Sequence, residues 1–596
     1  MSAVMVDRRV ADVSLASGVA LVVLFALLVT AQSVVLILGG AVTPVVTMLS
    51  PVAVLAALWF VLGRSPVAVR VAAVAIACGA IALSVVVATL TTDRSWDGNT
   101  YHKLAVGALR AGWNPVWAPV EDWAGSADGG SFAVLLESDP EGLWIDAYPK
   151  ATWLFGASLA QVTGSIESGK AFTLLMMIAL FLVATGYLAT RMRLWSAVLI
   201  GAVAAANPIA VTQVFTYYND GLMGTVVLIA VVLLSTLVDP GWDPPLWWRR
   251  ASPVALVSTV VVLANVKFTG LVHAGILGLV FLAWLCVRLR ANRRAVWALA
   301  GTGLAGGAIA LVVVGASSYL RNLVTEGNPL HPLFGRGTVD ILTHFTPVSF
   351  VGRDPVSRFA ISVLSTASNS VPPVADLKVP FTFTGGELHL FRSLDVRIGG
   401  WGVLFGGVLI VSVLLGVYLL IRFARTHRRH LHVFLLPIAA MAIGVVAVDG
   451  SWWARYTPHL VVVSLVVLVA LAVSRARALC LALSVLVLAN SALIGAVQVH
   501  EQWIQRQAGS LSQALSSAAE REGCIAVTAA ERLMLADPPD PDAAMFGGAV
   551  LNALEADGRA RVMTRDELLA REPGGSLVEF DSSGFIVIAI APEPCG

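Results

Sequence analysis

The chain has 596 residues, of which 57% are hydrophobic and only 13% are charged, about half of the roughly 25% found in ordinary soluble proteins. Its mean hydropathy is +0.82, and a soluble domain that exposed so much apolar surface would aggregate. The composition therefore excludes a soluble enzyme, a disordered protein and a secreted disulfide-rich scaffold. It predicts an all-α polytopic membrane protein, with membrane lipids as its surroundings.

The formal net charge is only +2, and 5 of the 39 basic residues are lysines (Lys103, Lys150, Lys170, Lys267 and Lys378). The arginines stand in short clusters between apolar runs. No long basic tract with interleaved aromatic residues occurs, so we expect no nucleic-acid partner.

About thirteen apolar runs approach or reach the roughly 20 residues that cross a bilayer at a rise of about 1.5 Å per residue. In chain order they lie at residues 13–38, 44–62, 68–91, 171–190, 195–212, 221–238, 253–266, 269–287, 295–316, 400–421, 432–448, 459–473 and 478–497. Two connections between them, 92–169 and 317–399, are long and polar. The sequence thus predicts a transmembrane domain over residues 1–497 with two large loops.

The arginines test this order, because short cytoplasmic loops of membrane proteins are rich in Lys and Arg. With Arg8 and Arg9 in the cytoplasm and runs of alternating direction, every short Arg cluster falls on the cytoplasmic side. These clusters are Arg64 and Arg70; Arg191 and Arg193; Arg249 and Arg250; Arg288, Arg290, Arg293 and Arg294; Arg422, Arg425, Arg428 and Arg429; and Arg475 and Arg477. Both large loops and the tail then lie outside, which predicts a multi-pass protein of the cell inner or plasma membrane.

The tail differs from the rest of the chain, since residues 501–596 contain 15 acidic and 7 basic residues. Helical patterns at 510–522, 543–556 and 564–572 alternate with β-like runs at 524–527, 561–563 and 585–590. This alternation predicts a small extracytoplasmic α/β domain over residues 498–596. Cys524 and Cys595 flank its strands, and a disulfide bridge and two free thiols are equally compatible with their positions.

Polar residues near membrane depth are costly and usually functional, and four such stretches fall on the outer side. The first, residues 93–102, places Asp93 and Asp97 directly after the third apolar run. A carboxylate that lipid and protein partly desolvate there could act as a general base. Alternatively, Asp97 only caps the helix that follows.

The second and third stretches interrupt later runs. Asn207-Pro208 is followed by Tyr218, Asn219 and Asp220, for which a turn with a helix cap is the simpler interpretation. Lys267 stands alone between two apolar runs, where a charge is costly unless it is paired or meets an anion. The alternative for Lys267 is that its side chain reaches up to the membrane surface.

The fourth stretch contains Arg321 and Arg455, which lie on the side that the Arg rule expects to be poor in arginine. Guanidinium groups at an outer interface suit a bidentate grip on phosphate, although lipid head groups or helix ends could also be their partners. The chain has no Walker A loop, zinc-spaced Cys/His cluster, H-E-x-x-H or G-x-S-x-G motif.

Together these stretches resemble the GT-C superfamily of integral-membrane glycosyltransferases, and most of all its bacterial aminoarabinose transferases and protein O-mannosyltransferases. The resemblance covers about residues 90–460 and rests on short motifs in a shared order. They are Trp96-Asp97-Gly98-Asn99-Thr100-Tyr101-His102, Tyr148-Pro149-Lys150, Asn207-Pro208, Tyr217-Tyr218-Asn219-Asp220, Lys267-Phe268-Thr269-Gly270, Arg321-Asn322, Gly327-Asn328-Pro329-Leu330-His331-Pro332 and Ala454-Arg455-Tyr456-Thr457-Pro458. The family's key Asp usually follows the first helix, whereas here it follows the third, which implies an N-terminal addition.

The resemblance implies a sugar donor on a polyprenyl phosphate and a lipid, glycan or protein acceptor outside the cytoplasm. Asp97 would take the proton of the acceptor hydroxyl, and Asp93 or Asp220 could share that role or hold the acceptor. The donor's phosphate and sugar would be bound by Lys267, Arg321, Arg455, His102, His331 and Tyr218. Some relatives use a divalent metal, and Asp93, Asp97 and Asp220 could form such a site here.

Two other classes of function remain open. A secondary transporter or lipid flippase would predict charges within the spans and an internal repeat, and no repeat is visible. A non-catalytic scaffold that presents the tail domain would tolerate the loss of Asp97.

Overall fold

The fold is that of a computed structural model, which describes residues 2–126, 142–288, 293–335, 337–426 and 431–507 together with five short strands of the tail. All thirteen predicted apolar runs are helical. Their helices are α1 (Ser2–Ile37), α2 (Pro44–Val61), α3 (Val67–Thr89), α9 (Phe172–Ala189), α10 (Leu194–Ala205), α12 (Asp220–Val238), α13 (Leu246–Val266), α14 (Phe268–Arg288), α15 (Arg293–Ala308), α19 (Phe405–Thr426), α20 (Leu431–Ala447), α21 (Val462–Val473) and α22 (Arg477–Gln507).

Within these described residues, ten helices are long and apolar enough to cross a membrane. Three of the thirteen, α10, α20 and α21, are shorter apolar helices. The prediction of an all-α, multi-pass membrane protein is therefore confirmed.

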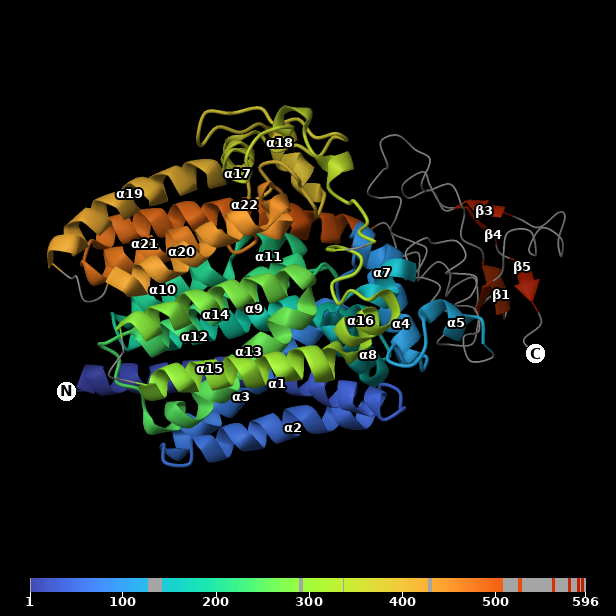
Figure 1. The fold of residues 1–596 in the computed structure, drawn as a ribbon, viewed down its shortest axis with the longest axis horizontal. Coiled ribbons are helices and arrows are strands. Elements are labelled where there is room, and N and C mark those ends of the chain that lie inside the picture. Colours follow the sequence, from blue (N-terminus) through green and yellow to red (C-terminus); the bar gives the residue numbers. More distant parts are fainter. Residues whose placement is uncertain are drawn as a thin grey trace.

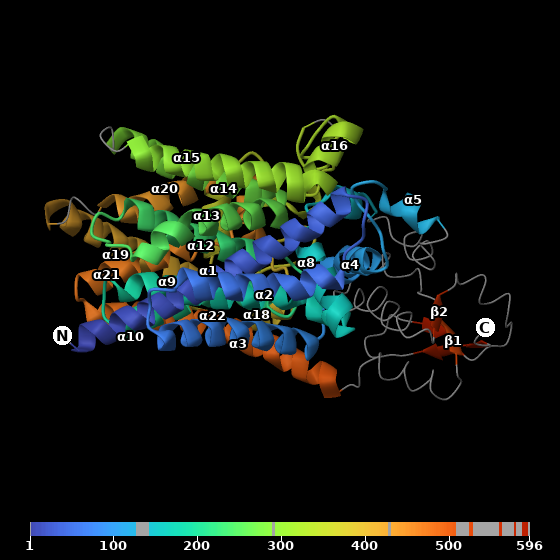
Figure 2. The same cartoon turned by 90° about the horizontal axis from the view of Figure 1, so that it is seen from below.

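The membrane helices lie along one common axis and form a bundle whose two ends differ (Figures 1 and 2). The N-terminus lies at one end, and the short helices of the first large loop gather at the other. These are α4 (Lys103–Arg110), α5 (Val120–Ala124), α7 (Gly142–Ala147) and α8 (Ala151–Thr163), joined there by α16 (Tyr319–Glu326) of the second loop. Because successive helices alternate in direction, the Arg-rich connections lie at the end of the N-terminus, which we call the Arg-rich end.

Helix α1 is an inner member of the bundle, because it packs closely against α9. A Cβ atom added to Gly18 would lie 2.8 Å from the carbonyl oxygen of Ala179, and one added to Gly186 would lie 2.5 Å from the backbone nitrogen of Leu15. Small residues let helix backbones approach closely in membranes, where van der Waals packing drives association.

The second large loop and the connection between α20 and α21 cover the end opposite the Arg-rich end. They contain α17 (Pro355–Leu364), α18 (Gly385–His389) and two short 3₁₀ turns, Asp449–Trp452 and Ala454–Tyr456. Another short helix, α11 (Pro208–Gln213), follows Asn207 and continues the path of α10. These segments bring polar residues from distant parts of the sequence to one end of the bundle.

The described part of the tail consists of strands. Strand β1 (Cys524–Val527) pairs in parallel with β2 (Ala560–Val562) and antiparallel with β5 (Ala591–Glu593), while β3 (Leu577–Glu579) pairs antiparallel with β4 (Val587–Ala589). Strands β1, β2 and β4 overlap the three β-like runs of the sequence. The helices predicted at 510–522, 543–556 and 564–572, and Cys595, lie outside the described residues, so the choice between a bridge and two free thiols is not tested.

Candidate functional site

The guanidinium group of Arg455 lies at the centre of a charged cluster at the end opposite the Arg-rich end. Its three nitrogens each meet a different carboxylate: Nη2 lies 2.7 Å from Asp97 Oδ2, Nε 3.1 Å from Asp220 Oδ2, and Nη1 3.1 Å from Asp395 Oδ2. Lys267 Nζ binds the other oxygen of Asp220 at 2.5 Å. We call these five residues the Arg455 cluster.

Asp97 directly precedes a π-helical turn, Gly98–His102, but its side chain makes no capping bond to the backbone of that turn. The carboxylate instead accepts hydrogen bonds from Arg455 and from the Tyr101 hydroxyl at 3.1 Å, and the Tyr218 hydroxyl lies 3.4 Å from its other oxygen. The helix-cap alternative for Asp97 is therefore wrong, and its carboxylate faces the cluster.

Asp220 and Lys267 are brought together by breaks in the membrane helices. Asp220 is the first residue of α12, and Lys267 is the single extended residue between α13 and α14. Lys267 is only 6% exposed, so its side chain does not reach up to the membrane surface. Gln213 of α11 also donates to Asp220, at 3.3 Å.

Asp395 is the member of the cluster that the sequence patterns do not reveal. It lies in the irregular segment before α19, and its Oδ1 accepts a hydrogen bond from Trp453 Nε1 at 2.7 Å. The only signal in the sequence is a lone acidic residue between Arg392 and Arg397. Trp453 and Gln213 are likewise absent from the site residues predicted from the sequence.

Aromatic rings line the cationic groups of the cluster. The Arg455 guanidinium carbon lies 5.0 Å from the centre of the Tyr218 ring and 5.7 Å from that of Trp453, and Lys267 Nζ lies 4.8 Å from that of Tyr456. Such cation–π contacts stabilise a desolvated cation in addition to its ion pairs. Tyr218 therefore contacts both charges of the Asp97–Arg455 pair.

The pKa values of two carboxylates of the cluster are shifted in opposite directions. Burial raises the pKa of Asp97, but the Arg455 charge and hydrogen bond outweigh it, and the net pKa lies below the ordinary value. For Asp395, burial outweighs Arg455 and Arg397, so its pKa is raised. Asp97 thus stays ionised, while Asp395 is the more easily protonated of the two.

The two histidines among the predicted binding residues lie in different surroundings. His102 is buried beside Tyr101, with ring centres 4.3 Å apart, and its Nδ1 accepts a hydrogen bond from Trp153 Nε1 at 2.6 Å. Burial lowers its pKa to about 4, despite the neighbouring Asp97, so the ring is neutral. His331 is held by its backbone, whose carbonyl accepts from Asn322 at 3.1 Å.

Arg321 lies outside the Arg455 cluster, in a neighbouring group of charges. Its Nη1 pairs with Asp146 Oδ1 at 3.1 Å, and the Asp146 carbonyl accepts from Lys150 Nζ at 2.8 Å. Lys150 also donates to the carbonyls of Tyr148 and Ser317. Burial lowers the pKa of Lys150 to about 7, although Asp146 opposes the shift.

Asp93 belongs to a third network, which fixes the backbone. Its carboxylate accepts from the backbone N–H groups of Ser95 and Tyr217, at 2.8 and 2.9 Å, and its own N–H donates to Glu167. Glu167 in turn pairs with Lys103 and Lys170. Burial raises the pKa of Asp93, and this network gives it a positioning role beside Tyr217 rather than a place at Arg455.

The predicted metal ligands are thus divided between two networks. Asp97 and Asp220 both turn to Arg455, whereas Asp93 does not, and among the described residues no group of three His, Cys, Asp or Glu side chains could hold a metal ion. A cavity of about 10 Å³ beside Arg455 is lined by Gln213, Asp395 and neighbouring residues, which is space for about one water molecule.

No family model matches the chain, and no curated protein matches it either. The functional interpretation of the Arg455 cluster therefore depends on its geometry.

Proposed function

We propose that the protein is a membrane glycosyltransferase of the GT-C type, which moves a sugar from a polyprenyl-phosphate donor to a lipid, glycan or protein hydroxyl. The observation that carries this proposal is the contact of Asp97 with Arg455, because it joins a base and an anion-binding group at one end of a membrane bundle. Polyprenyl donors present their phosphate at the membrane surface, where this end of the bundle would lie. The N-terminus would be cytoplasmic, and the tail would be an extracytoplasmic α/β domain.

In this mechanism Asp97 accepts the proton of the acceptor hydroxyl while the hydroxyl oxygen attacks the anomeric carbon of the donor sugar. The bond from that carbon to the phosphate oxygen breaks, and the lipid phosphate leaves with the bonding electrons. Arg455 and Lys267 stabilise the negative charge that develops on the leaving phosphate. A well-placed base contributes about 10²–10⁴-fold in rate, and the two cations supply much of the remainder.

A donor phosphate can bind Arg455 only through an exchange of partners. The three guanidinium nitrogens already meet Asp97, Asp220 and Asp395, one carboxylate each. A phosphate therefore replaces a carboxylate on the guanidinium rather than adding to the existing ones. Asp395 is the carboxylate that leaves, because burial disfavours its charged form more than Arg455 and Arg397 favour it, which raises its pKa.

The small cavity beside Arg455 supports the same sequence of events. It is lined by Asp395 and by Gly400 of the same segment, and it has no room for a sugar. The donor enters as this segment moves away from Arg455, and Asp395 then no longer competes with Asp97 for Arg455. Asp97 keeps its contact with Arg455 and remains the carboxylate that takes the proton of the acceptor hydroxyl in this proposal.

The test is transfer by the full-length protein in nanodiscs, with a panel of polyprenyl-phosphate sugars and with released polyprenyl phosphate as the readout. Asp97→Asn should reduce release by about 10²–10⁴-fold, since it removes the base. The matched control is Asp354→Asn, at an exposed residue that caps α17, where Asn is an equally good cap. Full activity of a folded Asp97→Asn protein would remove Asp97 as the base. Release from no donor in the panel, with the wild type intact, would count against a transferase.

A further inference from the structure

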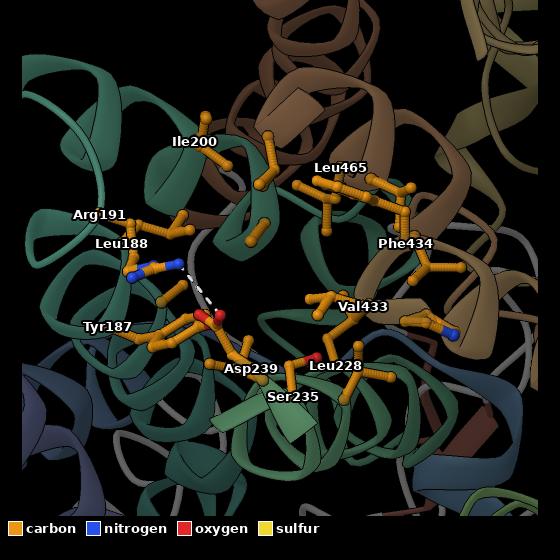
Figure 3. Close-up of a pocket in the computed structure, with 18 of the residues that line it drawn as sticks. Tyr187, Leu188, Arg191, Ile200, Leu228, Ser235, Asp239, Val433, Phe434 and Leu465 are labelled. Atoms are coloured by element: carbon orange, nitrogen blue, oxygen red, sulfur yellow. Dashed lines mark hydrogen bonds and ion pairs between the residues drawn. The ribbon is translucent and has the colours of Figure 1, made fainter. Parts of the chain in front are cut away.

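A large cavity lies in the membrane part of the molecule, away from the Arg455 cluster. Its volume is about 330 Å³, and it is bordered by α9, α10 and α12 on one side and by α19, α20 and α21 on the other. Figure 3 shows Ile200, Leu228, Phe434 and Leu465 around its open centre. Ligand sites of proteins have volumes of about 300–1,000 Å³, so the cavity is large enough for a ligand.

The polar groups of the cavity gather at one end of it. Arg191 Nη2 pairs with Asp239 Oδ1 at 3.0 Å, and the Tyr187 hydroxyl donates to Asp239 Oδ2 at 2.8 Å (Figure 3). Tyr187 is in the last turn of α9, and Arg191 and Asp239 follow the C-terminal ends of α9 and α12. Both helices end at the Arg-rich end of the bundle, so the polar end of the cavity is there.

The length of the cavity matches one leaflet of a membrane. Its wall on α21 runs from Val462 to Val473, which is about 16 Å at the helical rise of about 1.5 Å per residue. Half of a bilayer's hydrocarbon core of about 30 Å has nearly the same depth. With the Arg-rich end at one membrane surface, the cavity would reach from the head-group level of that leaflet to about the middle of the membrane.

The chemistry of the wall selects a hydrocarbon chain. Beyond Tyr187, Arg191, Ser235 and Asp239 the lining side chains are apolar, so water there would lack hydrogen-bond partners. An empty space would leave the lining atoms without dispersion contacts, which a chain of methylene groups restores.

The polar end selects a negative head group. Asp239 already neutralises Arg191, but two other arginines are exposed close in sequence to lining residues: Arg193 follows Arg191 by two positions, and Arg475 follows Val473 by two positions. Arginines at the membrane surface attract anionic lipids.

We propose that this cavity binds one acyl chain of an anionic phospholipid, with the lipid phosphate near Arg191, Arg193 and Arg475. The bound lipid fills the space between α9, α10 and α12 and the C-terminal helices α19 to α21. This site does not depend on the proposed transferase activity, because it lies toward the opposite end of the bundle from Arg455.

The test is photo-crosslinking of the full-length protein in nanodiscs, with phosphatidylglycerol that carries a diazirine at the end of one acyl chain. We expect label on α10 and α21, at the depth of Ile200 and Val462. Ala204→Phe on α10 and Val466→Phe on α21 fill the cavity from two sides and should each remove this label. Val198→Phe is the matched control, because Val198 is on α10 but 39% exposed, and it should keep the label.

A second arm tests the head group. Arg193→Gln combined with Arg475→Gln should reduce labelling by phosphatidylglycerol more than labelling by diazirine phosphatidylethanolamine, because the ammonium group of the latter already offsets the charge of its phosphate. Label that persists in both cavity-filling variants, with each protein monodisperse on gel filtration, would overturn the proposal. Better competition by a polyprenyl phosphate than by phosphatidylglycerol would overturn the choice of a phospholipid.

Discussion

The Arg455 guanidinium meets three carboxylates in a partly desolvated site, where unbalanced charge is costly. Lys267 lessens the excess of negative charge because it shares Asp220 with Arg455. Arg455 then stabilises the charged forms of Asp97 and Asp395 to different extents. Asp97 also accepts hydroxyl hydrogen bonds from two tyrosines, whereas Asp395 has Trp453 as its other partner. The two carboxylates should therefore affect stability differently.

We expect the two carboxylates to give opposite dependences of stability on pH. Folding lowers the pKa of Asp97 below 3.8, so its contribution to the free energy of unfolding is present above pH 3.8 and is lost as the pH falls through the lowered value. Folding raises the pKa of Asp395 above 3.8, so its contribution decreases as the pH rises from 3.8 through the raised value.

At neutral pH, Asp97→Asn should therefore cost about 2 kcal/mol, as expected for the loss of a hydrogen bond between charged groups. Asp395→Asn should cost less than Asp97→Asn, because Asn still accepts from Trp453 and no buried charge is left to desolvate. Thermal unfolding of both variants in the same detergent between pH 3 and pH 8 provides the measurement. An equal loss in the two variants would show that Asp395 also gains from being ionised.

The helices were predictable from the sequence because membrane spans depend on local composition. Each of the thirteen apolar runs is a helix, and the breaks at Asn207, Asp220 and Lys267 fall where polar residues interrupt those runs. The arginine pattern also predicted which connections lie at the same end of the bundle. These features need no knowledge of which helices touch.

The partners within the site were not predictable, because they depend on long-range packing. Asp97 and Arg455 meet across 358 positions of the chain, and Asp395 comes from an irregular segment with no periodic pattern. Arg321 and Asp93 are also predicted site residues, yet they pair with Asp146 and with backbone groups instead. Sequence order thus gave candidates for the cluster but could not assign their partners.

The close contact between α1 and α9 predicts that Gly186 in α9 and Gly79 in α3 respond differently to substitution by alanine. Gly186→Ala places a Cβ atom 2.5 Å from the Leu15 backbone, and overpacking of this kind costs about 1–3 kcal/mol. Gly79 in α3 has no atom within 4 Å of such a Cβ. Gly79→Ala should be neutral or stabilise by up to about 1 kcal/mol, through helix propensity.

Thermal unfolding in detergent and the yield of monodisperse protein measure both glycine variants. Equal behaviour of the two would mean that α1 does not pack tightly against α9. In that case α1 would not be an inner helix of the bundle.

At the scale of the whole molecule, the C-terminal helices are joined to the rest of the bundle in different ways at its two ends. At one end Arg455, in the connection between α20 and α21, pairs with Asp97 and Asp220 of the N-terminal half. Toward the other end the same helices border the apolar cavity. Ion pairs hold one end of this interface, and the proposed lipid chain fills the other. Movement of the C-terminal helices would change both sites together.

The sidedness of the bundle is the last prediction, and it decides whether a polyprenyl donor can reach Asp97. The positive-inside rule puts the Arg-rich end in the cytoplasm, so Ser370 of the second large loop should be outside and Thr190, beside Arg191, inside. Both residues are exposed. In a background without the five native cysteines, a membrane-impermeant maleimide should modify Ser370→Cys on intact cells and Thr190→Cys only after permeabilisation. The reverse pattern would place Asp97 and Arg455 at the cytoplasmic face, where the proposed outward-facing donor is not presented, and the transferase proposal would fail.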